Sequence, residues 1–509
     1  MSAPAKGAGV GGLVIFGTLS ATLMQTLDTT IANVALPHMQ GSLSASQEQV
    51  AWVLTSYIVA SAIATTPTGY LANRFGVRQV FLWAVAGFTV ASMLCGLATD
   101  LTQIVVFRIL QGIFGAALVP LSQTTLLDHS PPGQYGRAMA AWGVGVMIGP
   151  ILGPALGGWL TENYSWRWVF FINLPVGVVT YFALSAALPK AAPKKMAPMD
   201  FTGFAFLSLA IAAMQLMLDR GQTLDWFSSP EIMLECAIAV AAFYLFVSHS
   251  LTTPSPFISP ALFRDRNMLG GLVLITVMGV VLFSTFALLP PFLQNLQGYP
   301  VVTAGLVLAP RGIGTMLAMQ ISGRLLERCD GRLIIGAGLL LLALSLHQMS
   351  RFSIDVPASA IISSGFIQGL GLGCIFVPLS AIAFSTLRPE LRGEGTALYS
   401  LLRNVGSSVG IALAFAYQDY GTKMAHSVLV ENINPFNPAL LGVVNSHVGV
   451  LGAASVFNLE VEIQRQSAVI GMLGVFHYMT YGVLLALPFL LLFKRAEKSR
   501  LAGPLGAAE

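Results

Sequence analysis

Apolar runs long enough to cross a lipid bilayer recur along almost the whole chain of 509 residues. A transmembrane helix needs about 20 mostly apolar residues. Fourteen such runs are found, at residues 10–34, 49–71, 79–98, 101–123, 138–160, 168–188, 201–219, 231–251, 268–290, 303–323, 333–350, 358–380, 395–417 and 469–493. Only 9% of the residues are charged, against roughly 25% in soluble proteins. The sequence therefore predicts an all-α integral membrane protein with 14 transmembrane helices, the first of them retained rather than cleaved as a signal peptide.

Positive charges are unevenly divided between the loops on the two sides of the membrane. If the N-terminus is cytoplasmic, 18 of the 26 lysine and arginine residues fall in cytoplasmic loops and tails, five in outer loops and three inside helices. Lysine and arginine concentrate on the cytoplasmic side of membrane proteins. We therefore predict that both termini are cytoplasmic and that the lipid bilayer is the chain's main solvent.

An internal repeat divides the chain. The segment Gly69–Arg78 recurs as Gly323–Arg332 at an offset of 254 residues, and Gln111–Ser122 recurs as Gln368–Ser380 at offsets of 257 and 258. Agreement between two separate pairs indicates two copies of one six-helix unit. Two similar halves that rock around a central site are a recurrent design of secondary transporters.

The repeat predicts three regions. Residues 1–188 form an N-terminal six-helix bundle, and residues 189–267 form a linker with two inserted transmembrane helices. Residues 268–509 form a C-terminal six-helix bundle with a long outer loop at about 418–468.

Asp28 and Arg108 are charged residues inside predicted helices of the N-terminal half. Ionised groups in the bilayer are costly and tend to mark functional sites. Burial and a nearby cation act in opposite directions on the protonation of a carboxyl group, so a buried pair of this kind can carry a proton. We predict a role in proton coupling for both. The alternatives are a helix-packing hydrogen bond for Asp28 and a fixed structural tether for Arg108.

Other polar side chains inside the predicted helices are candidates for contact with a substrate. Arg403 is a cation in the C-terminal half that matches Arg108, and Arg311 follows Pro310. The predicted substrate-cavity residues are Asn33, Gln111, Gln123, Arg311, Arg403 and Asn404.

The composition of two segments predicts a gating loop and a helix that acts as a hinge. Small residues let helix backbones approach closely, and prolines inside a helix permit bending. The loop after the second predicted helix places two arginines beside a glycine, where they can bond a helix C-terminus or an acid, or simply hold the loop in the cytoplasm. The predicted gating and hinge residues are Gly69, Arg74, Arg78, Gly145, Gly149, Pro150, Gly153 and Pro154.

No sequence motif for catalysis or nucleotide binding is found. The chain has no Gly-x-x-x-x-Gly-Lys phosphate-binding segment, no metal-ligand spacing and no nucleophile elbow. The four cysteines show no metal or disulfide pattern. We predict that the protein is not an enzyme, needs no cofactor or metal, does not bind nucleic acid, and draws its energy from a gradient.

At these motifs the chain resembles the major facilitator superfamily, in its fourteen-helix drug:proton antiporter branch. The resemblance covers nearly the whole chain and is carried by residues 69–78, by Arg108 with Gln111-Gly112, by the glycine- and proline-rich segment 142–158, by Leu27–Pro37 and by Trp166–Pro175. It implies two six-helix bundles with pseudo-two-fold symmetry plus two inserted helices. It also implies a bacterial inner-membrane pump that exports hydrophobic or amphipathic compounds by alternating access in exchange for protons.

Three further segments resemble the EmrB-like group, the EmrB/QacA subfamily of this branch. They are Leu218–Gly221, Asp225–Ser229 and Asn434–Pro438. The resemblance implies a tripartite assembly with an EmrA-like periplasmic membrane-fusion adaptor and a TolC-like outer-membrane channel. One residue departs from the superfamily pattern, because Asn73 stands where aspartate is usual.

Two other functions remain open at this stage. A dedicated exporter of one metabolite, such as a siderophore or organic acid, would use Arg108, Arg311 and Arg403 to pair with an anion. A membrane sensor or scaffold with a degenerate transporter fold is the other, and the presence of Asp28 with Arg108 argues against it.

Overall fold

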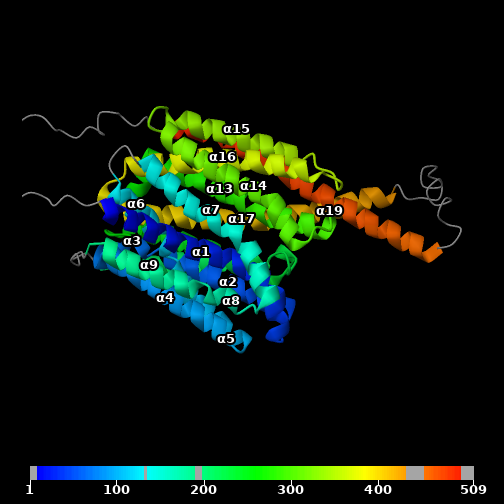
Figure 1. The fold of residues 1–509 in the computed structure, drawn as a ribbon, viewed down its shortest axis with the longest axis horizontal. Helices are drawn as coiled ribbons and strands as arrows, with labels where there is room; N and C mark the ends of the chain where they lie inside the picture. The colour runs from blue at the N-terminus through cyan, green and yellow to red at the C-terminus, as the bar shows by residue number, and fades with distance from the viewer. Residues whose placement is uncertain (1–7, 131–134, 190–197, 432–451, 494–509) are drawn as a thin grey trace, which may run out of the picture.

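The computed structural model describes residues 8–130, 135–189, 198–431 and 452–493, and within these ranges every regular element is helical. Figure 1 shows two bundles of long helices lying side by side, one built from the blue and cyan segments and one from the green to red segments. The division into two bundles agrees with the repeat in the sequence. One pair of helices extends well beyond the bundles at the right of the view.

The N-terminal bundle contains helices that are more broken than the apolar runs suggest. Its elements are α1 (Ala8–Ser42), α2 (Gln47–Thr65), α3 (Thr68–Phe75), α4 (Val77–Leu97), α5 (Leu101–Gly115), α6 (Leu118–His129), α7 (Tyr135–Asn163), α8 (Trp168–Phe171) and α9 (Asn173–Ala187). The run at 49–71 is bent by 52° between α2 and α3. Pro67 lies at this bend, where it has no N–H to continue the helical hydrogen bonds.

The inserted helices bridge the two bundles. They comprise α10 (Phe201–Arg220), a 3₁₀ turn η1 (Trp226–Ser228), α11 (Pro230–Thr252) and the short α12 (Ala261–Arg264). On α10, Gln215 donates from Nε2 to Ser408 Oγ of the C-terminal half at 2.9 Å, while Asp219 accepts a hydrogen bond from Thr55 on α2. The insertion is therefore attached to both halves.

The C-terminal bundle repeats the first with longer helices. Its elements are α13 (Arg266–Pro291), a π-helical turn η2 (Phe292–Leu296), α14 (Val301–Leu325), α15 (Gly331–Met349), α16 (Ala358–Ser385), α17 (Pro389–Glu431), α19 (Gly452–Leu485) and a 3₁₀ turn η3 (Leu487–Leu492). Side-chain caps fix the starts of α13 and α15. Asp265 accepts from the backbone N–H groups of Asn267 and Met268, and Asp330 from that of Arg332.

The segment predicted as a long outer loop, at about 418–468, is helical in its described part. Helix α17 continues to Glu431, and α19 already begins at Gly452. The two helices pack closely where two glycines face each other. A Cβ added to Gly421 would lie only 3.0 Å from Gly471 Cα, so this approach requires small residues. His426 Nε2 also lies 3.0 Å from Glu460 Oε1. The Asn434–Pro438 segment lies outside the described residues.

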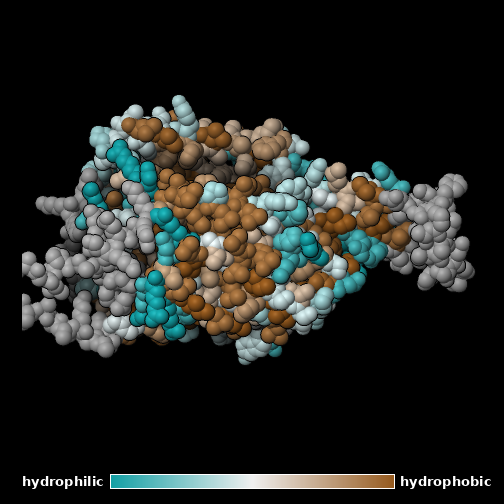
Figure 2. Space-filling view, turned by 90° about the horizontal axis from the view of Figure 1, so that it is seen from above, coloured by the Kyte–Doolittle hydropathy of each residue, from teal (hydrophilic) through white to brown (hydrophobic). Residues whose placement is uncertain are grey.

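The surface carries an apolar belt that matches a lipid environment. Figure 2 shows hydrophobic side chains across the middle of the molecule, with hydrophilic residues on either side. Tyr244 and Leu251 on α11 are 71% and 80% exposed. Such exposure is normal only where lipid replaces water.

Eleven helices of the described part are long and apolar enough to cross a membrane, or twelve if α2 and α3 form one bent span. All fourteen predicted runs coincide with helices, but α1 and α7 are not among those eleven or twelve. The number fourteen therefore stays a prediction, whereas the all-α membrane fold with two bundles is confirmed.

Glycines bring α7 against α1 over most of a helix face. A Cβ on Gly149 would lie 2.6 Å from the backbone carbon of Thr26, and one on Gly153 would lie 2.1 Å from Thr30 Oγ1. Thr30 Oγ1 also donates to Gly149 O at 3.1 Å. The glycines therefore allow backbone contact between these helices.

We predict that Gly149→Ala lowers the free energy of unfolding by about 1–3 kcal/mol, because the methyl group must displace the α1 backbone. Gly158→Ala on the same helix is the matched control, since its Cβ would meet only Val34 Cγ1 at 4.0 Å. Thermal unfolding of the purified proteins in detergent measures both. Equal midpoints for the two variants would contradict the close packing of α1 and α7.

Candidate functional site

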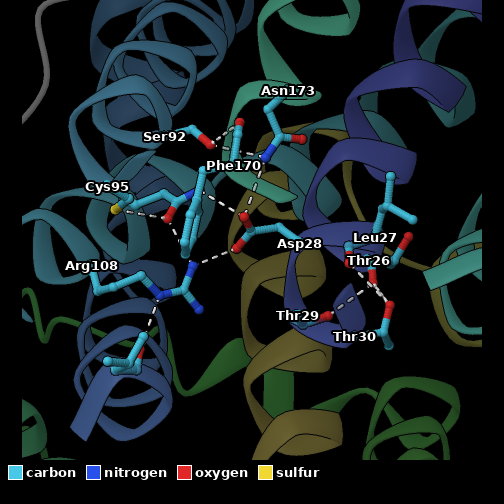
Figure 3. A network of polar contacts seen from close by, with 12 residues as sticks. Thr26, Leu27, Asp28, Thr29, Thr30, Ser92, Cys95, Arg108, Phe170 and Asn173 are labelled. Atoms are coloured by element: carbon cyan, nitrogen blue, oxygen red, sulfur yellow. Dashed lines mark hydrogen bonds and ion pairs between the residues drawn. The ribbon is translucent and has the colours of Figure 1, made fainter. Parts of the chain in front are cut away.

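A carboxylate and a guanidinium meet inside the N-terminal bundle. Arg108 on α5 donates from Nη1 to Asp28 Oδ2 on α1 at 2.7 Å, and both side chains are fully buried. Figure 3 shows the two side chains facing each other between their helices. The sequence predicts both residues inside helices, and the structure shows that they are in contact.

Two amides complete the hydrogen bonding of the Asp28 carboxylate. Gln111 lies one helical turn after Arg108 on α5 and donates from Nε2 to Asp28 Oδ1 at 2.8 Å. Its Oε1 accepts from Arg108 Nη1 at 2.7 Å. Asn173, at the start of α9, donates to the same Oδ1 at 3.2 Å and to Ser92 Oγ at 3.0 Å. Three donors from two other helices therefore converge on one buried carboxylate.

The guanidinium is held from the side of α2. Arg108 Nε donates to the backbone oxygen of Val53 at 2.9 Å, and its carbon Cζ lies 4.2 Å from the centre of the Tyr57 ring. Arg108 Nη2 has no hydrogen-bond partner. The cation is thus attached to α2 by contacts that do not require the carboxylate.

Sequence reasoning assigned no role to Asn173 or Tyr57. Asn173 belongs to the Trp166–Pro175 segment that carries part of the family resemblance, and this was its only signal. Tyr57 is an aromatic residue in an apolar helix, where nothing marks it as a partner of a cation. Only the packing of α2 against α5 reveals its position.

The predicted substrate-cavity residues do not form one group. Gln111 belongs to the Asp28 cluster. Asn33 is exposed on α1, and Gln123 is buried on α6 with its Nε2 3.7 Å from Met139 Sδ. In the C-terminal half, Arg311 is buried on α14, while Arg403 and Asn404 are half-buried on α17.

The predicted gating loop contacts the opposite half. A Cβ on Gly69 would lie 2.6 Å from the backbone N and Cα of Glu394 on α17. Asn73 donates from Nδ2 to the backbone oxygen of Glu390 at 3.2 Å. The asparagine that replaces the usual aspartate therefore still binds the first turn of α17, by an uncharged hydrogen bond.

The two arginines of this loop have no carboxylate partner among the described residues. Arg78 donates to the oxygen of Ser185 in the last turn of α9 at 3.0 Å. Arg74 donates to the hydroxyl of Tyr70 at 3.0 Å. Arg78 thus bonds a helix C-terminus, one of the two arrangements expected, and Arg74 stays on its own helix.

Further contacts join the halves at the same end of the molecule. Thr124 and Thr396 share a hydrogen bond of 2.7 Å, and Arg392 lies 3.0 Å from Asp128. We call this end, with its contacts of Gly69, Thr124 and Asp128 to α17, the closed end.

The predicted hinge helix α7 changes partner along its length. Gly143 faces the C-terminal half, where its Cβ would lie 2.4 Å from Met319 Sδ, whereas Gly145 faces Leu19 of α1 at 3.1 Å. Pro150 is half-buried within α7, and the side chain of Pro154 lies outside the described ones. Helix α7 therefore connects α1 to the opposite bundle.

Within the described part of the chain, no group of three or more histidine, cysteine, aspartate or glutamate residues could hold a metal ion.

Comparisons with known proteins agree with this geometry. The sequence profile of the Major Facilitator Superfamily matches residues 18–411. The chain is 38% identical over 420 residues to the multidrug export protein EmrB of Escherichia coli K12, covering 82% of each chain. It is 36% identical over 438 residues to the fatty acid resistance protein FarB of Neisseria gonorrhoeae, covering 86% of each.

The fold is also that of a solved transporter. The proton:xylose symporter XylE superposes with a TM-score of 0.61 at 13% identity, covering 95% of this chain and 96% of the other. At this identity the likeness concerns the fold alone. Taken with the sequence matches, it shows that the chain belongs to the major facilitator superfamily, in the group of EmrB-like multidrug export proteins.

Proposed function

We propose that this multidrug efflux transporter exchanges protons for its substrates and that Asp28 carries the proton. The observation that supports the proposal is the buried Asp28–Arg108 pair with its two amide donors. An ion pair in the interior is stable only while both partners are charged. Protonation of Asp28 therefore changes the energy of the whole cluster.

Only one member of the cluster can change its protonation state. A guanidinium stays charged at every working pH, so the carboxylate must accept the proton. Breaking a buried pair by neutralising one partner costs about 3–5 kcal/mol. Arg108 keeps Val53 and Tyr57 as partners on α2, whereas Asp28 on α1 loses its strongest contact. Protonation thus loosens α1 from α2 and α5.

Helix α1 transmits this change to the other half. The residues on either side of Asp28 include Thr26 and Thr30, which contact Gly149 and Gly153 of α7. Helix α7 in turn packs on α14 of the C-terminal bundle. A proton at Asp28 is thereby coupled to the contacts between the bundles, as alternating access requires.

The orientation of the protein in the membrane follows from the distribution of its lysine and arginine residues. The positive-inside rule places the gating loop, and with it the closed end, at the cytoplasmic face. The structure is then closed toward the cytoplasm, and both termini are cytoplasmic in this multi-pass inner-membrane protein.

The paired helices α17 and α19 support a partnership outside the membrane. They extend beyond the bundles at the end opposite the closed end (Figure 1). In this orientation they project into the periplasm, where an EmrA-like adaptor and a TolC-like channel would complete a tripartite export path. The substrates are hydrophobic or amphipathic compounds, and the relative named for fatty acid resistance adds lipophilic acids to the candidates.

Asp28→Asn should abolish the dependence of transport on a pH gradient, because an amide cannot take up and release a proton. The measurement is transport of a lipophilic dye by inverted vesicles with and without an imposed gradient. Asp419→Asn is the control, since Asp419 is part-exposed and pairs only with Lys423 four residues on. Gradient-driven transport retained by Asp28→Asn would move the proton to another group.

Gly69→Leu should shift the population away from the state that is closed to the cytoplasm, because the side chain would enter the α17 backbone. Thr124→Cys with Thr396→Cys reports this state by disulfide formation, after the four native cysteines are replaced by serine. We expect a severalfold lower cross-linking yield with Gly69→Leu.

The control for this experiment is Gly41→Leu, at an exposed position with nothing near its Cβ. An unchanged yield in Gly69→Leu would show that the Gly69 contact does not hold the closed end.

A further inference from the structure

One helix contact of the N-terminal half recurs at the corresponding position of the C-terminal half. A Cβ on Gly112 would lie 2.6 Å from Tyr57 O, and one on Gly369 would lie 2.0 Å from Arg311 O. The offsets of the sequence repeat relate these pairs, because 112 + 257 = 369 and 57 + 254 = 311. The packing of α2 on α5 therefore recurs in α14 on α16, with Arg311 in the place of Tyr57.

The same repeat offsets identify the residue of the C-terminal half that corresponds to Asp28. Gln111 donates to Asp28 at 2.8 Å, and its repeat Gln368 donates from Nε2 to Thr285 Oγ1 at 3.3 Å. Both pairs are 83 residues apart along the chain. Thr285 on α13 thus occupies the place of Asp28 on α1, and the carboxylate is missing from the C-terminal half.

The C-terminal half also contains a buried arginine, but on a helix that does not correspond to that of Arg108. The counterpart of Arg108 is Gly365, because 108 + 257 = 365. A Cβ there would lie 3.7 Å from Arg311 Cβ, so Arg311 borders the space left by the missing side chain. Arg311 donates from Nη2 to Leu282 O at 3.1 Å, and its Cζ lies 3.9 Å from the centre of the Phe286 ring.

This second cation has no counter-charge. Arg311 is 3% exposed and forms no ion pair with any described residue. Its Nε has no hydrogen-bond partner in the described part of the chain, and neither does the buried Oε1 of Gln368. A guanidinium within the bilayer needs a carboxylate or other acceptor, and the structure supplies only one backbone oxygen and an aromatic face.

We propose that Arg311 binds the carboxylate of a lipophilic organic acid that the protein transports. This assignment of a substrate class rests on the proposed efflux function. The Nε of the guanidinium is buried and has no hydrogen-bond partner among the described residues, so it can donate to a carboxylate that approaches it. Thr285 bears no charge, so the position that corresponds to Asp28 supplies no counter-charge for Arg311. Phe286 is half-buried and contributes an apolar surface for the rest of the molecule.

The test is equilibrium dialysis of the purified full-length protein in detergent with two acids, 1-naphthaleneacetate and decanoate, and with their neutral amides. Arg311→Gln should weaken binding of the acids about tenfold or more, through loss of charge-assisted hydrogen bonds, and leave the amides nearly unchanged. Arg351→Gln, at an exposed arginine, is the matched control.

A second variant tests the same claim without removing the cation. Thr285→Asp places a carboxylate where the N-terminal half has Asp28, so it should pair with Arg311 and exclude the acids as strongly as Arg311→Gln does. This variant keeps the buried guanidinium and distinguishes lost binding from lost folding.

Three results would overturn the proposal: no binding of either acid to the wild type, equal loss of acids and amides in both variants, or displacement of the acids by chloride. Transport of a neutral dye by inverted vesicles is measured in parallel. Its absence in the wild type would contradict efflux itself, whereas normal dye transport with unchanged acid binding in Arg311→Gln would contradict only the role of Arg311.

Discussion

The arrangement of the N-terminal bundle depends on an ion pair between a buried carboxylate and a buried guanidinium, which lie 2.7 Å apart. Each charge is tolerated in the membrane interior because the other is present, and the protein adds the donors that the pair still needs. Gln111 and Asn173 supply them from α5 and α9, and Val53 accepts from the guanidinium on α2. Four helices therefore owe their relative positions to one cluster whose charge a single proton can change.

The two halves share one helix arrangement but differ in whether their buried arginine has a carboxylate partner. In the first, the cation and the acid neutralise each other inside the protein. In the second, Thr285 replaces the acid and Arg311 brings the cation from a different helix. Because α7 connects α1 to α14, the proton-sensitive half is mechanically joined to the helix that bears the unpaired cation. In the proposed mechanism the two halves therefore differ, with a proton site in the N-terminal half and a binding site for an anion in the C-terminal half.

Apolar length, positive charge and an internal repeat were enough to predict the two bundles and the insertion, because the bilayer allows few other solutions. They could not predict that α17 and α19 continue as paired helices beyond the bundles, since this depends on the close approach of Gly421 and Gly471. Asp28 was predictable because a lone acid in an apolar helix is conspicuous. Asn173 and Tyr57 were not, because polar and aromatic residues in helices have many roles and only tertiary contacts select one.

Infrared difference spectroscopy of the purified protein between high and low pH tests the central claim most directly. A protonated carboxyl group in an apolar site gives a carbonyl stretching band separate from those of exposed acids. The account predicts such a band at low pH in the wild type, its loss in Asp28→Asn, and its retention in Asp419→Asn. A band that persists unchanged in Asp28→Asn would contradict the assignment of the proton to this carboxylate.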